Sequence, residues 1–395
     1  MKNRRGITKY LLLLIMLLMA WPAQAHSEVL IQCPGDADGD GVSDDPNIAC
    51  IHIAAGDGFV KMADGYPQYV FGFSLVPPTV APGDVTSYAT LKAELPAPTI
   101  TVRQGQELYL TLTNVGMMLR PDLSDPHSLH WHGFPHQAPV FDGEPMASFG
   151  TNMGASFTFY YKAVEPGTYM YHCHVEATEH MQMGMLGNLY MTPAQDGTSY
   201  EYPPGSGRAY TKFAYNDGDG STGYDVAYPI QIHAFDPKFH DASLTVQPLD
   251  FAGIFDSYPM LNGRGYPDTI KTVPIANTYD GNESQKVHSL ITATKGQRIL
   301  LRISNLSFDY YTPTVLGVPM TVVGRDARIL RGPTGKNLYY KTSSVDTGGG
   351  QSVDVILDTA DTAPGTYFLY TTNLNNLSNN AQERGGMMTE LIINP

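Results

Sequence analysis

The sequence predicts an all-β fold built from two tandem β-sandwich domains, and two observations support this prediction. Glycine (39), proline (29) and tyrosine (25) are frequent among the 395 residues, a mixture that suits many strands joined by tight turns. The chain also repeats itself: residues 102–114 match residues 293–305, and Pro-Gly-Thr-Tyr recurs at 166–169 and 364–367. Because both landmarks recur in the same order, the chain contains two similar units.

The first element is a leader. Basic residues at positions 2, 4, 5 and 9 precede an apolar run over 10–20 and a small-residue site at 23–25. This order is typical of a secretory signal peptide over residues 1–25, with cleavage expected after Ala25. The apolar run is too short for a lasting membrane span, so we expect a periplasmic or secreted protein without a membrane anchor. The twin-arginine and general secretory routes both stay open.

The charge balance limits the partners. Lys and Arg number 24 against 38 Asp and Glu, which gives a net charge of −14. An acidic surface repels phosphate backbones and tolerates cations, so a nucleic-acid partner is disfavoured.

A disulfide-closed acidic segment is expected over residues 26–55. The chain has three cysteines, and in an oxidising compartment an odd number implies one pair and one thiol with another role. Cys33 and Cys50 bracket alternate aspartates with turn glycines, which match the first half of a calcium-binding loop. The alternative is a solvated acidic turn that binds no cation. The candidate calcium ligands are Asp36, Asp38, Asp40 and Asp44.

The two sandwich domains are expected over residues 56–195 and 208–395. Residues 196–207, which contain Pro, Gly and Ser, form the predicted linker between them. Nine of the twelve histidines lie before residue 200, so metal chemistry is expected in the first domain.

The unpaired Cys173 lies between two histidines in a predicted strand. Successive side chains of a strand point to opposite faces, so His172 and His174 share one face and Cys173 lies on the other. Residues 127–132 contain three further histidines. By the same rule, His130 and His132 share one face of the strand and His127 lies on the opposite face. If the strands are neighbours, one face collects four imidazoles and the other collects one imidazole with the thiol.

A blue copper centre is expected on the face with the thiol. Two histidines, one thiolate and a weak thioether are the ligand set of such a centre, which exchanges single electrons. Four histidines without a carboxylate suit copper on the opposite face as well, and the peptide bonds that flank the cysteine give a short path for electrons between the faces. The blue copper ligands are expected to be His127, Cys173, His180 and Met185, and the others His130, His132, His172 and His174.

Together, the two strings resemble those of multicopper oxidases, such as laccases and their two-domain relatives, and the resemblance extends to residues 258–264. It implies two cupredoxin-like, Greek-key domains, copper as the cofactor, and oxidation of a phenol or metal ion coupled to reduction of O₂. By position, the resemblance assigns His127, Cys173, His180 and Met185 to the type 1 site, His130 to a type 2 site, and His132, His172 and His174 to type 3 sites.

The second domain departs from the family. The trinuclear cluster of multicopper oxidases takes eight histidines, four from each of two facing domains, and this chain supplies four. Alignment of the repeats puts residues 311, 314, 316 and 370–372 at the ligand positions of the second domain, and none is a histidine. We therefore expect this domain to be copper-free. Five residues separate His174 from His180 where laccases usually have three, so the loop over the type 1 site should be longer.

Three arrangements of the four remaining imidazoles stay open. Two copies of the first domain could pool their histidines across a two-fold axis in a homo-oligomer, or a partner chain could supply the missing half. Both arrangements predict an exported oxidoreductase whose partners are a small-molecule or metal-ion electron donor and O₂. Alternatively, the imidazoles hold one copper or none, and the protein is a blue copper electron carrier or copper-binding protein without oxidase activity.

Overall fold

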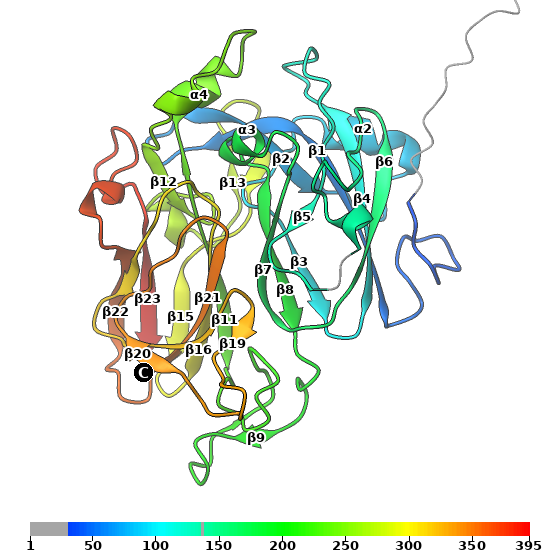
Figure 1. The fold of residues 1–395 in the computed structure, drawn as a ribbon. Coiled ribbons are helices and arrows are strands. Elements are labelled where there is room, and N and C mark those ends of the chain that lie inside the picture. Colours follow the sequence, from blue (N-terminus) through cyan, green and yellow to red (C-terminus); the bar gives the residue numbers. More distant parts are fainter. Residues whose placement is uncertain (1–30, 136–137) are drawn as a thin grey trace, which may run out of the picture.

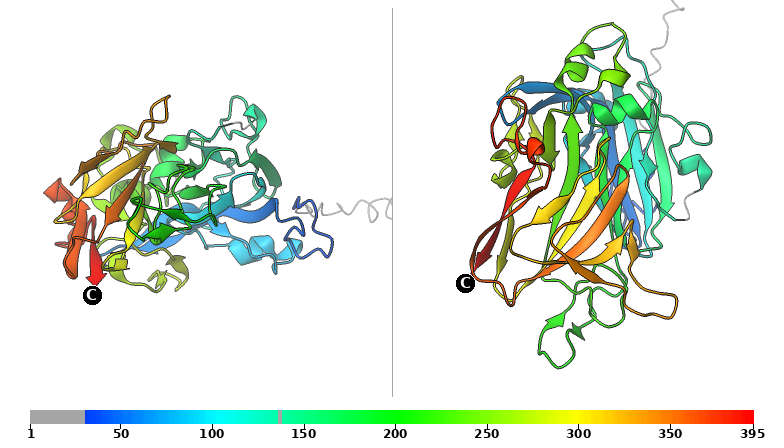
Figure 2. Two further views of the ribbon diagram at one scale, coloured as in Figure 1. Left: turned by 90° about the horizontal axis from the view of Figure 1, so that it is seen from below. Right: turned by 60° about the vertical axis from the view of Figure 1, so that its left-hand side comes forward.

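The computed structural model of the protein describes residues 31–135 and 138–395, so the predicted leader lies outside the described residues. Two β-sandwich domains lie side by side, the first coloured blue to green and the second mainly yellow to red (Figure 1). The same two bodies are distinct when the molecule is seen from below (Figure 2). The predicted all-β fold of two tandem domains is confirmed.

Two four-stranded sheets form the N-terminal sandwich, in the orders β2-β1-β4-β6 and β3-β8-β7-β5. Alternating apolar side chains of both sheets fill one core, which includes Leu108, Leu110 and Leu112 of β4. The strands are β1 (Ile48–Lys61), β2 (Pro67–Leu75), β3 (Ala97–Arg103), β4 (Glu107–Gly116), β5 (His130–Trp131), β6 (Ser156–Lys162), β7 (Gly167–His172) and β8 (Leu186–Thr192).

A seven-stranded and a four-stranded sheet form the C-terminal sandwich, in the orders β12-β11-β16-β21-β18-β19, with β20 on β18, and β15-β23-β22-β17. Its core includes Ile299, Leu301 and Ile303 of β16. The strands are β11 (Val226–Phe235), β12 (Tyr258–Leu261), β15 (Ile291–Thr294), β16 (Arg298–Asn305), β17 (Pro313–Val315), β18 (Met320–Arg325), β19 (Arg328–Ile329), β20 (Tyr340–Thr342), β21 (Gln351–Asp358), β22 (Gly365–Thr371) and β23 (Met388–Asn394).

Short elements connect the sheets. Two small hairpins pair β9 (Tyr200–Glu201) with β10 (Ala209–Tyr210) and β13 (Ile275–Ala276) with β14 (Glu283–Gln285). Three short α-helices are described, α2 (Val85–Ala89), α3 (Ala177–Gln182) and α4 (Pro237–Ala242). None of the helices in the described part of the chain is long and apolar enough to span a bilayer.

The two domains share one topology. Each strand pairing in one domain has an equivalent in the other. The first sheet of the N-terminal domain, with β1, β2, β4 and β6, corresponds to β11, β12, β16 and β21 in that order. The second sheet, with β3, β5, β7 and β8, corresponds to β15, β17, β22 and β23. The repeated residues are equivalent, because Gly105 and Gly296 turn at φ +96° and +97°. The hydroxyls of Tyr169 and Tyr367 each donate to the carbonyl four residues upstream. The sequence repeat therefore reflects two copies of one fold.

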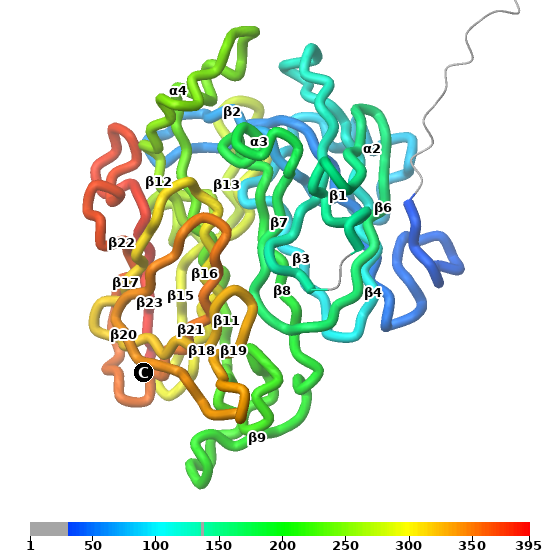
Figure 3. Tube along the Cα trace, in the orientation of Figure 1, coloured from blue at the N-terminus to red at the C-terminus, as the bar shows by residue number. Residues whose placement is uncertain are grey.

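The observed strands differ from the expected domain boundaries in two places. Strand β1 begins at Ile48, inside the segment expected over 26–55, so Cys50 already lies in the first strand of the sandwich. The expected linker 196–207 contains β9, which pairs with β10 beyond its end. This segment runs along the end of the molecule opposite α3 (Figure 3).

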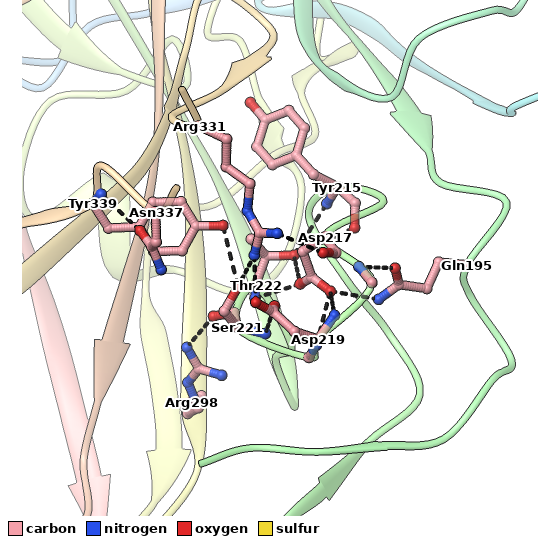
Figure 4. A network of polar contacts seen from close by, with 12 residues as sticks. Gln195, Tyr215, Asp217, Asp219, Ser221, Thr222, Arg298, Arg331, Asn337 and Tyr339 are labelled. Atoms are coloured by element: carbon pink, nitrogen blue, oxygen red, sulfur yellow. Dashed lines mark hydrogen bonds and ion pairs between the residues drawn. The ribbon is translucent and has the colours of Figure 1, made fainter. Parts of the chain in front are cut away.

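A polar network fastens the segment after the linker to the C-terminal domain (Figure 4). The carboxylate of Asp217 accepts hydrogen bonds from the backbone N–H groups of Asp219 and Thr222. The guanidinium of Arg331 donates to the side chains of Asp219 (2.6 Å) and Ser221 (2.9 Å) and to the carbonyl of Asp217 (2.8 Å). An arginine side chain thus supplies the positive charge in this Asp-Gly-Asp-Gly turn.

A buried ion pair lies where the two domains pack against each other. Arg302 of β16 and Asp354 of β21 are almost fully buried, 3.9 Å apart. Thr168 of β7 donates to Asp354 (2.6 Å) and accepts from Arg302 (3.0 Å), and the hydroxyl of Tyr215 donates to Asp354 (2.5 Å). A buried charge is costly unless it is paired and hydrogen-bonded, so these four residues fix the position of β7 against the C-terminal domain.

The replacement Asp354→Ala should lower the free energy of unfolding by about 3–5 kcal/mol, because Arg302 would be buried without its partner. Chemical denaturation followed by circular dichroism measures this loss. The control is Lys162→Ala, since Lys162 is exposed and its ion pair with Glu107 lies at the surface, and it should cost less than about 1 kcal/mol. Equal losses for the two variants would contradict the role given to the buried pair.

Candidate metal centre

The end of β7 brings the predicted ligands together. Strand β5 pairs with β7 so that His130 lies opposite His172. The chain leaves the strand at Cys173, whose backbone N–H donates to the carbonyl of Met185 (3.1 Å). The two strings of predicted ligands therefore meet at this end of the strand, as the alternation of side chains predicts.

One group joins the thiol to two imidazoles. The Nδ1 atoms of His127 and His180 lie 3.7 and 3.2 Å from Sγ of Cys173. All three side chains are buried, as is Met185, and the four residues are called the blue-copper group below. Metal–nitrogen and metal–sulfur bonds of about 2.0–2.3 Å span separations of this size. The two nitrogens and the sulfur thus fit one metal ion.

The surroundings suit this group to a soft metal ion. Burial lowers the pKa of His180 to about 4 and that of His127 well below its usual value, so both imidazoles are neutral and free to bind a metal. Burial also raises the pKa of Cys173 to about 12, so the thiol keeps its proton until a metal displaces it. The backbone N–H of Ser128 lies 3.4 Å from Sγ and favours the thiolate.

A short helix covers the blue-copper group. Helix α3 follows Glu176, whose backbone is left-handed (φ +46°), and it carries His180 on its buried side. The chain then returns so that the N–H of Met185 donates to the carbonyl of His180 (2.9 Å). The spacing predicts a longer loop here, but not its helical form, because six residues are too few for a helical pattern to be recognised.

The second group collects four imidazoles, called the imidazole cluster below. One nitrogen from each of His130, His132 and His172 lies within 4.8 Å of the others, close enough for one metal ion. The Nε2 atoms of His132 and His172 are 2.8 Å apart, and the ring of His174 lies 4.8 Å from that of His130. Only His172 is fully buried, so the cluster has an open side.

Backbone groups orient three of these rings. Nδ1 of His130 lies 2.8 Å from the carbonyl oxygen of Asp142, and Nδ1 of His172 lies 2.7 Å from the carbonyl oxygen of the next residue. His132 is hydrogen-bonded to the backbone of Gly350. A ring that donates from Nδ1 presents the lone pair of Nε2. The rings are therefore oriented for a metal before one binds.

Gly350 of the C-terminal domain contacts this cluster. Its φ is +81°, and a Cβ atom at this position would lie 2.8 Å from the ring of His132. A larger residue would therefore displace the imidazole as well as strain the backbone.

The C-terminal domain contributes no comparable group. Thr314 pairs with Tyr370 in the same way as His130 pairs with His172, which agrees with the alignment of the repeats. Across the described residues, no close group of three His, Cys, Asp or Glu side chains lies in this domain. All four imidazoles of the cluster therefore come from the N-terminal domain.

The C-terminal domain nevertheless contacts the loop between His180 and Met185 of the blue-copper group. His240 of α4 is fully buried, and its ring nitrogens lie 2.5 Å from the carbonyl oxygen of Tyr69 and 2.9 Å from that of Gln182. The side-chain amide of Gln182 also donates to Asp256 (2.7 Å). Two residues of the C-terminal domain therefore clamp one residue of the metal-binding loop.

The residues that orient the ligands are not predicted by the sequence. Ser128, Asp142 and Gly350 act mainly through the backbone, so residue type gives little signal. His240 offers a signal, as one of three histidines in the second domain, but it has no partner at i±2. The sequence places it in the core or at the surface, and the structure adds the contact with the metal-binding loop.

The N-terminal loop is closed by the predicted disulfide between Cys33 and Cys50, which is present. The carboxylates at positions 36, 38 and 40 lie within 4.8 Å of one another. The first of them accepts hydrogen bonds from the N–H groups of residues 39 (2.7 Å) and 41 (2.9 Å). Asp44 lies outside this close group and accepts from Ala37 (3.4 Å). These bonds shape the loop, and a calcium ion stays a prediction.

Family models now place the chain among known proteins. Models described as multicopper oxidase match residues 77–196 and 249–390. The chain belongs to the multicopper oxidase family. Membership implies copper as the cofactor, and the neutral imidazoles and buried thiol of the blue-copper group fit that metal.

Two relatives and one solved structure illustrate the family. The multicopper oxidase MmcO of Mycobacterium tuberculosis is 33% identical over 93 residues, 24% of this chain and 17% of that protein. The copper-containing nitrite reductase of Neisseria meningitidis serogroup B is 30% identical over 118 residues, 30% of this chain and 28% of that protein. The matches thus span less than a third of these relatives. The blue copper oxidase of Nitrosomonas europaea shares the fold, with a TM-score of 0.63 and 21% identity over 87% of this chain and 85% of that one.

Copper-loaded protein should absorb in the red through thiolate-to-copper charge transfer, and Cys173→Ser should abolish this band, because serine supplies no thiolate. Visible absorption and copper analysis measure the effect. The control is the double variant Cys33→Ser, Cys50→Ser, which removes the disulfide and should keep the band. A colourless wild-type protein would rule out the blue-copper assignment.

The variant His240→Leu should change the visible and electron paramagnetic resonance spectra of the blue copper and lower its affinity, because two buried carbonyls lose their contact with the ring. The expected loss of stability is about 1–3 kcal/mol. His240→Gln, whose amide is a hydrogen-bond donor, should restore most of the spectrum. The control is His52→Leu, another buried histidine, which contacts Thr113. An unchanged spectrum in His240→Leu would show that the clamp does not position the ligands.

Proposed function

We propose that this protein is a copper-dependent oxidase that acts outside the cytoplasm. The blue-copper group receives single electrons from a reduced phenol or metal ion, and the imidazole cluster supplies the site at which O₂ is reduced. The observation that carries this proposal is the peptide bond between His172 and Cys173, which directly joins one residue of each group.

The chain's own contribution is to fix both sets of ligands. Bound copper would supply one-electron exchange at the first group and reduction of the acceptor at the second. Burial keeps water away from the thiol and its two imidazoles, and backbone hydrogen bonds hold the rings of the cluster. Ligands that are held in place lower the reorganisation that each electron transfer requires.

The open side of the imidazole cluster supports completion by another chain. Reduction of O₂ to water takes four electrons, and a trinuclear cluster of this family takes twice the number of histidines found here. Three of the four imidazoles are only half-buried, so they can face histidines of a second copy across a two-fold axis or those of a partner chain. We favour the second copy, because it needs no further gene product.

Reduction of nitrite is a second candidate function. Three imidazoles of one chain converge on a single position, which suits one copper with an open coordination site. Reduction of nitrite to nitric oxide takes one electron and two protons, so one blue copper and one further copper suffice. The 30% identity with a copper-containing nitrite reductase over 118 residues also favours this reading.

Four measurements on the copper-loaded chain separate these functions: copper per chain, mass in solution, O₂ uptake and nitrite consumption. The oxidase should be an oligomer that consumes O₂, whereas the nitrite reductase should hold about two coppers per chain. His132→Ala should stop reduction of either acceptor and keep the blue band, and His288→Ala, on a half-buried histidine of the other domain, is the control. A monomer that holds one copper and reduces neither acceptor would contradict both functions and indicate an electron carrier.

The N-terminal loop is proposed to bind calcium, and export is proposed from the leader and the disulfide. If calcium binds, removal with EGTA should lower the melting temperature of the wild type, because the carboxylates at 36, 38 and 40 would repel one another. The variant Asp38→Asn, Asp40→Asn should not respond to EGTA. Equal melting temperatures of the wild type with and without EGTA would show that the loop is a solvated turn that binds no calcium.

Mass spectrometry of the exported chain tests cleavage after Ala25.

A further inference from the structure

A hollow lies beneath the disulfide-closed N-terminal loop, on the outer face of the first sheet of the N-terminal domain. Its volume is about 530 Å³, and small-molecule sites typically enclose about 300–1,000 Å³. The loop is deep blue in Figure 1 and lies on the side of this domain that faces away from the C-terminal domain. We call this space the N-terminal hollow.

Two segments form the apolar wall of the N-terminal hollow. One is the loop that the disulfide ties to β1, and the other is residues 75–82, which follow β2 and contribute three prolines to the lining. The segments touch, since a Cβ atom on Gly41 would lie 3.0 Å from Cβ of Pro78. Proline fixes the backbone angle φ, so the second segment is a stiff wall. Leu75, which is 44% exposed, and Val80 add aliphatic surface to it.

The N-terminal hollow offers no partner for a charged ligand. None of the described residues that line it is Lys or Arg, and Asp36 is the one carboxylate among them. This carboxylate already accepts the backbone N–H groups of residues 39, 40 and 41. An anion would meet no positive group, and a cation would lose its hydration against an apolar wall. The hollow therefore favours an uncharged molecule.

One imidazole supplies a polar group to the hollow. Ile51 and Ile53 of β1 pack toward the core of the sandwich, so His52 between them projects from the outer face of the sheet. His52 is only 8% exposed, and its Nε2 lies 2.7 Å from Oγ1 of Thr113. Among the described residues, no group is hydrogen-bonded to the other ring nitrogen, Nδ1, which keeps access to solvent. Because His52 lines the hollow, Nδ1 is free to bond to a molecule inside it.

The neutral ring of His52 fits a hydroxyl group. Burial lowers the pKa of His52 to about 4, so near neutral pH the ring has one N–H and one lone pair. Either nitrogen can carry the proton, because the hydroxyl of Thr113 can donate or accept. A hydroxyl group on a ligand also donates and accepts, so it bonds to Nδ1 in both tautomers. A carbonyl oxygen would fit only one of them.

We propose that the N-terminal hollow binds a small uncharged aliphatic alcohol. The hydrocarbon part of the alcohol packs against the prolines and the aliphatic side chains, which removes apolar surface from water. The hydroxyl group bonds to Nδ1 of His52 and sets the orientation. No electron is transferred at this site, so it adds a binding function that does not depend on the copper ligands.

Titration calorimetry on the purified chain tests this site with 4-tert-butylcyclohexanol. Two analogues of the same shape carry a carboxylate or an ammonium group in place of the hydroxyl. The alcohol should bind best, because the hollow has no partner for either charge. The variant Cys173→Ser, which lacks the blue-copper thiolate, should bind the alcohol with unchanged affinity. Failure of the copper assignment and failure of this site are thus separate results.

Two variants locate the alcohol. His52→Leu should weaken its binding roughly tenfold, because leucine fills similar space and forms no hydrogen bond. Leu75→Asn should weaken it roughly fivefold, because an amide replaces part of the apolar wall. The matched control is Leu338→Asn, on a half-exposed leucine of the C-terminal domain outside the hollow, and it should leave the affinity unchanged. A circular dichroism melt verifies that each variant is folded.

Four results would overturn the proposal. They are no binding of the alcohol to the folded wild type, binding of a charged analogue that is equal or tighter, unchanged affinity in either variant, and a hollow filled by the protein itself. Nuclear magnetic resonance of the chain labelled with ¹⁵N-histidine tests the last result. The Nδ1 signal of His52 should shift when the alcohol is added. No shift, together with Overhauser contacts from this ring to residues before Ile31 or to a second copy, would assign the hollow to the protein.

Discussion

The metal-binding half of this protein depends on the alternation of side chains along β7. His172 is the last residue of β7 and Cys173 follows it directly, and neighbours in an extended chain project to opposite sides. One side chain therefore joins a dry group with two imidazoles, and the other joins a cluster with an open side. A change of register by one residue would exchange the two, so the pairing of β5 with β7 is the constraint that every other contact of the site supports.

The C-terminal domain acts as a support for a site whose ligands it does not provide. Gly350 lies against one ring of the imidazole cluster, and His240 and Asp256 hold Gln182 in the metal-binding loop. The buried pair of Arg302 and Asp354 holds β7 itself. Ligand side chains at the end of a sandwich can be lost without damage to its core, whereas these supporting contacts hold the other domain in place. Loss of ligands and retention of the fold are thus physically compatible.

Much of the fold and both groups of candidate ligands are accessible from the sequence, because the signals are local. Two-residue alternation sorts Cys173 from its neighbours, turn glycines mark both repeats, and the count of cysteines isolates the disulfide. The supporting contacts are not local, since His240 reaches Tyr69 across 171 positions and acts on a backbone carbonyl. Helix α3 is too short for a periodic signal. The start of β1 at Ile48 is hidden because the strand continues directly from the acidic loop.

The two acidic turns of the chain balance their negative charge in different ways. Around Asp217 the balancing positive charge belongs to the protein itself, because the side chain of Arg331 from the C-terminal domain enters the turn. Around Asp36 the donors that contact the carboxylate, among the residues the structure describes, are uncharged backbone amides. The first turn therefore carries its own counter-charge, and the attachment of the inter-domain segment to the C-terminal domain needs no bound cation.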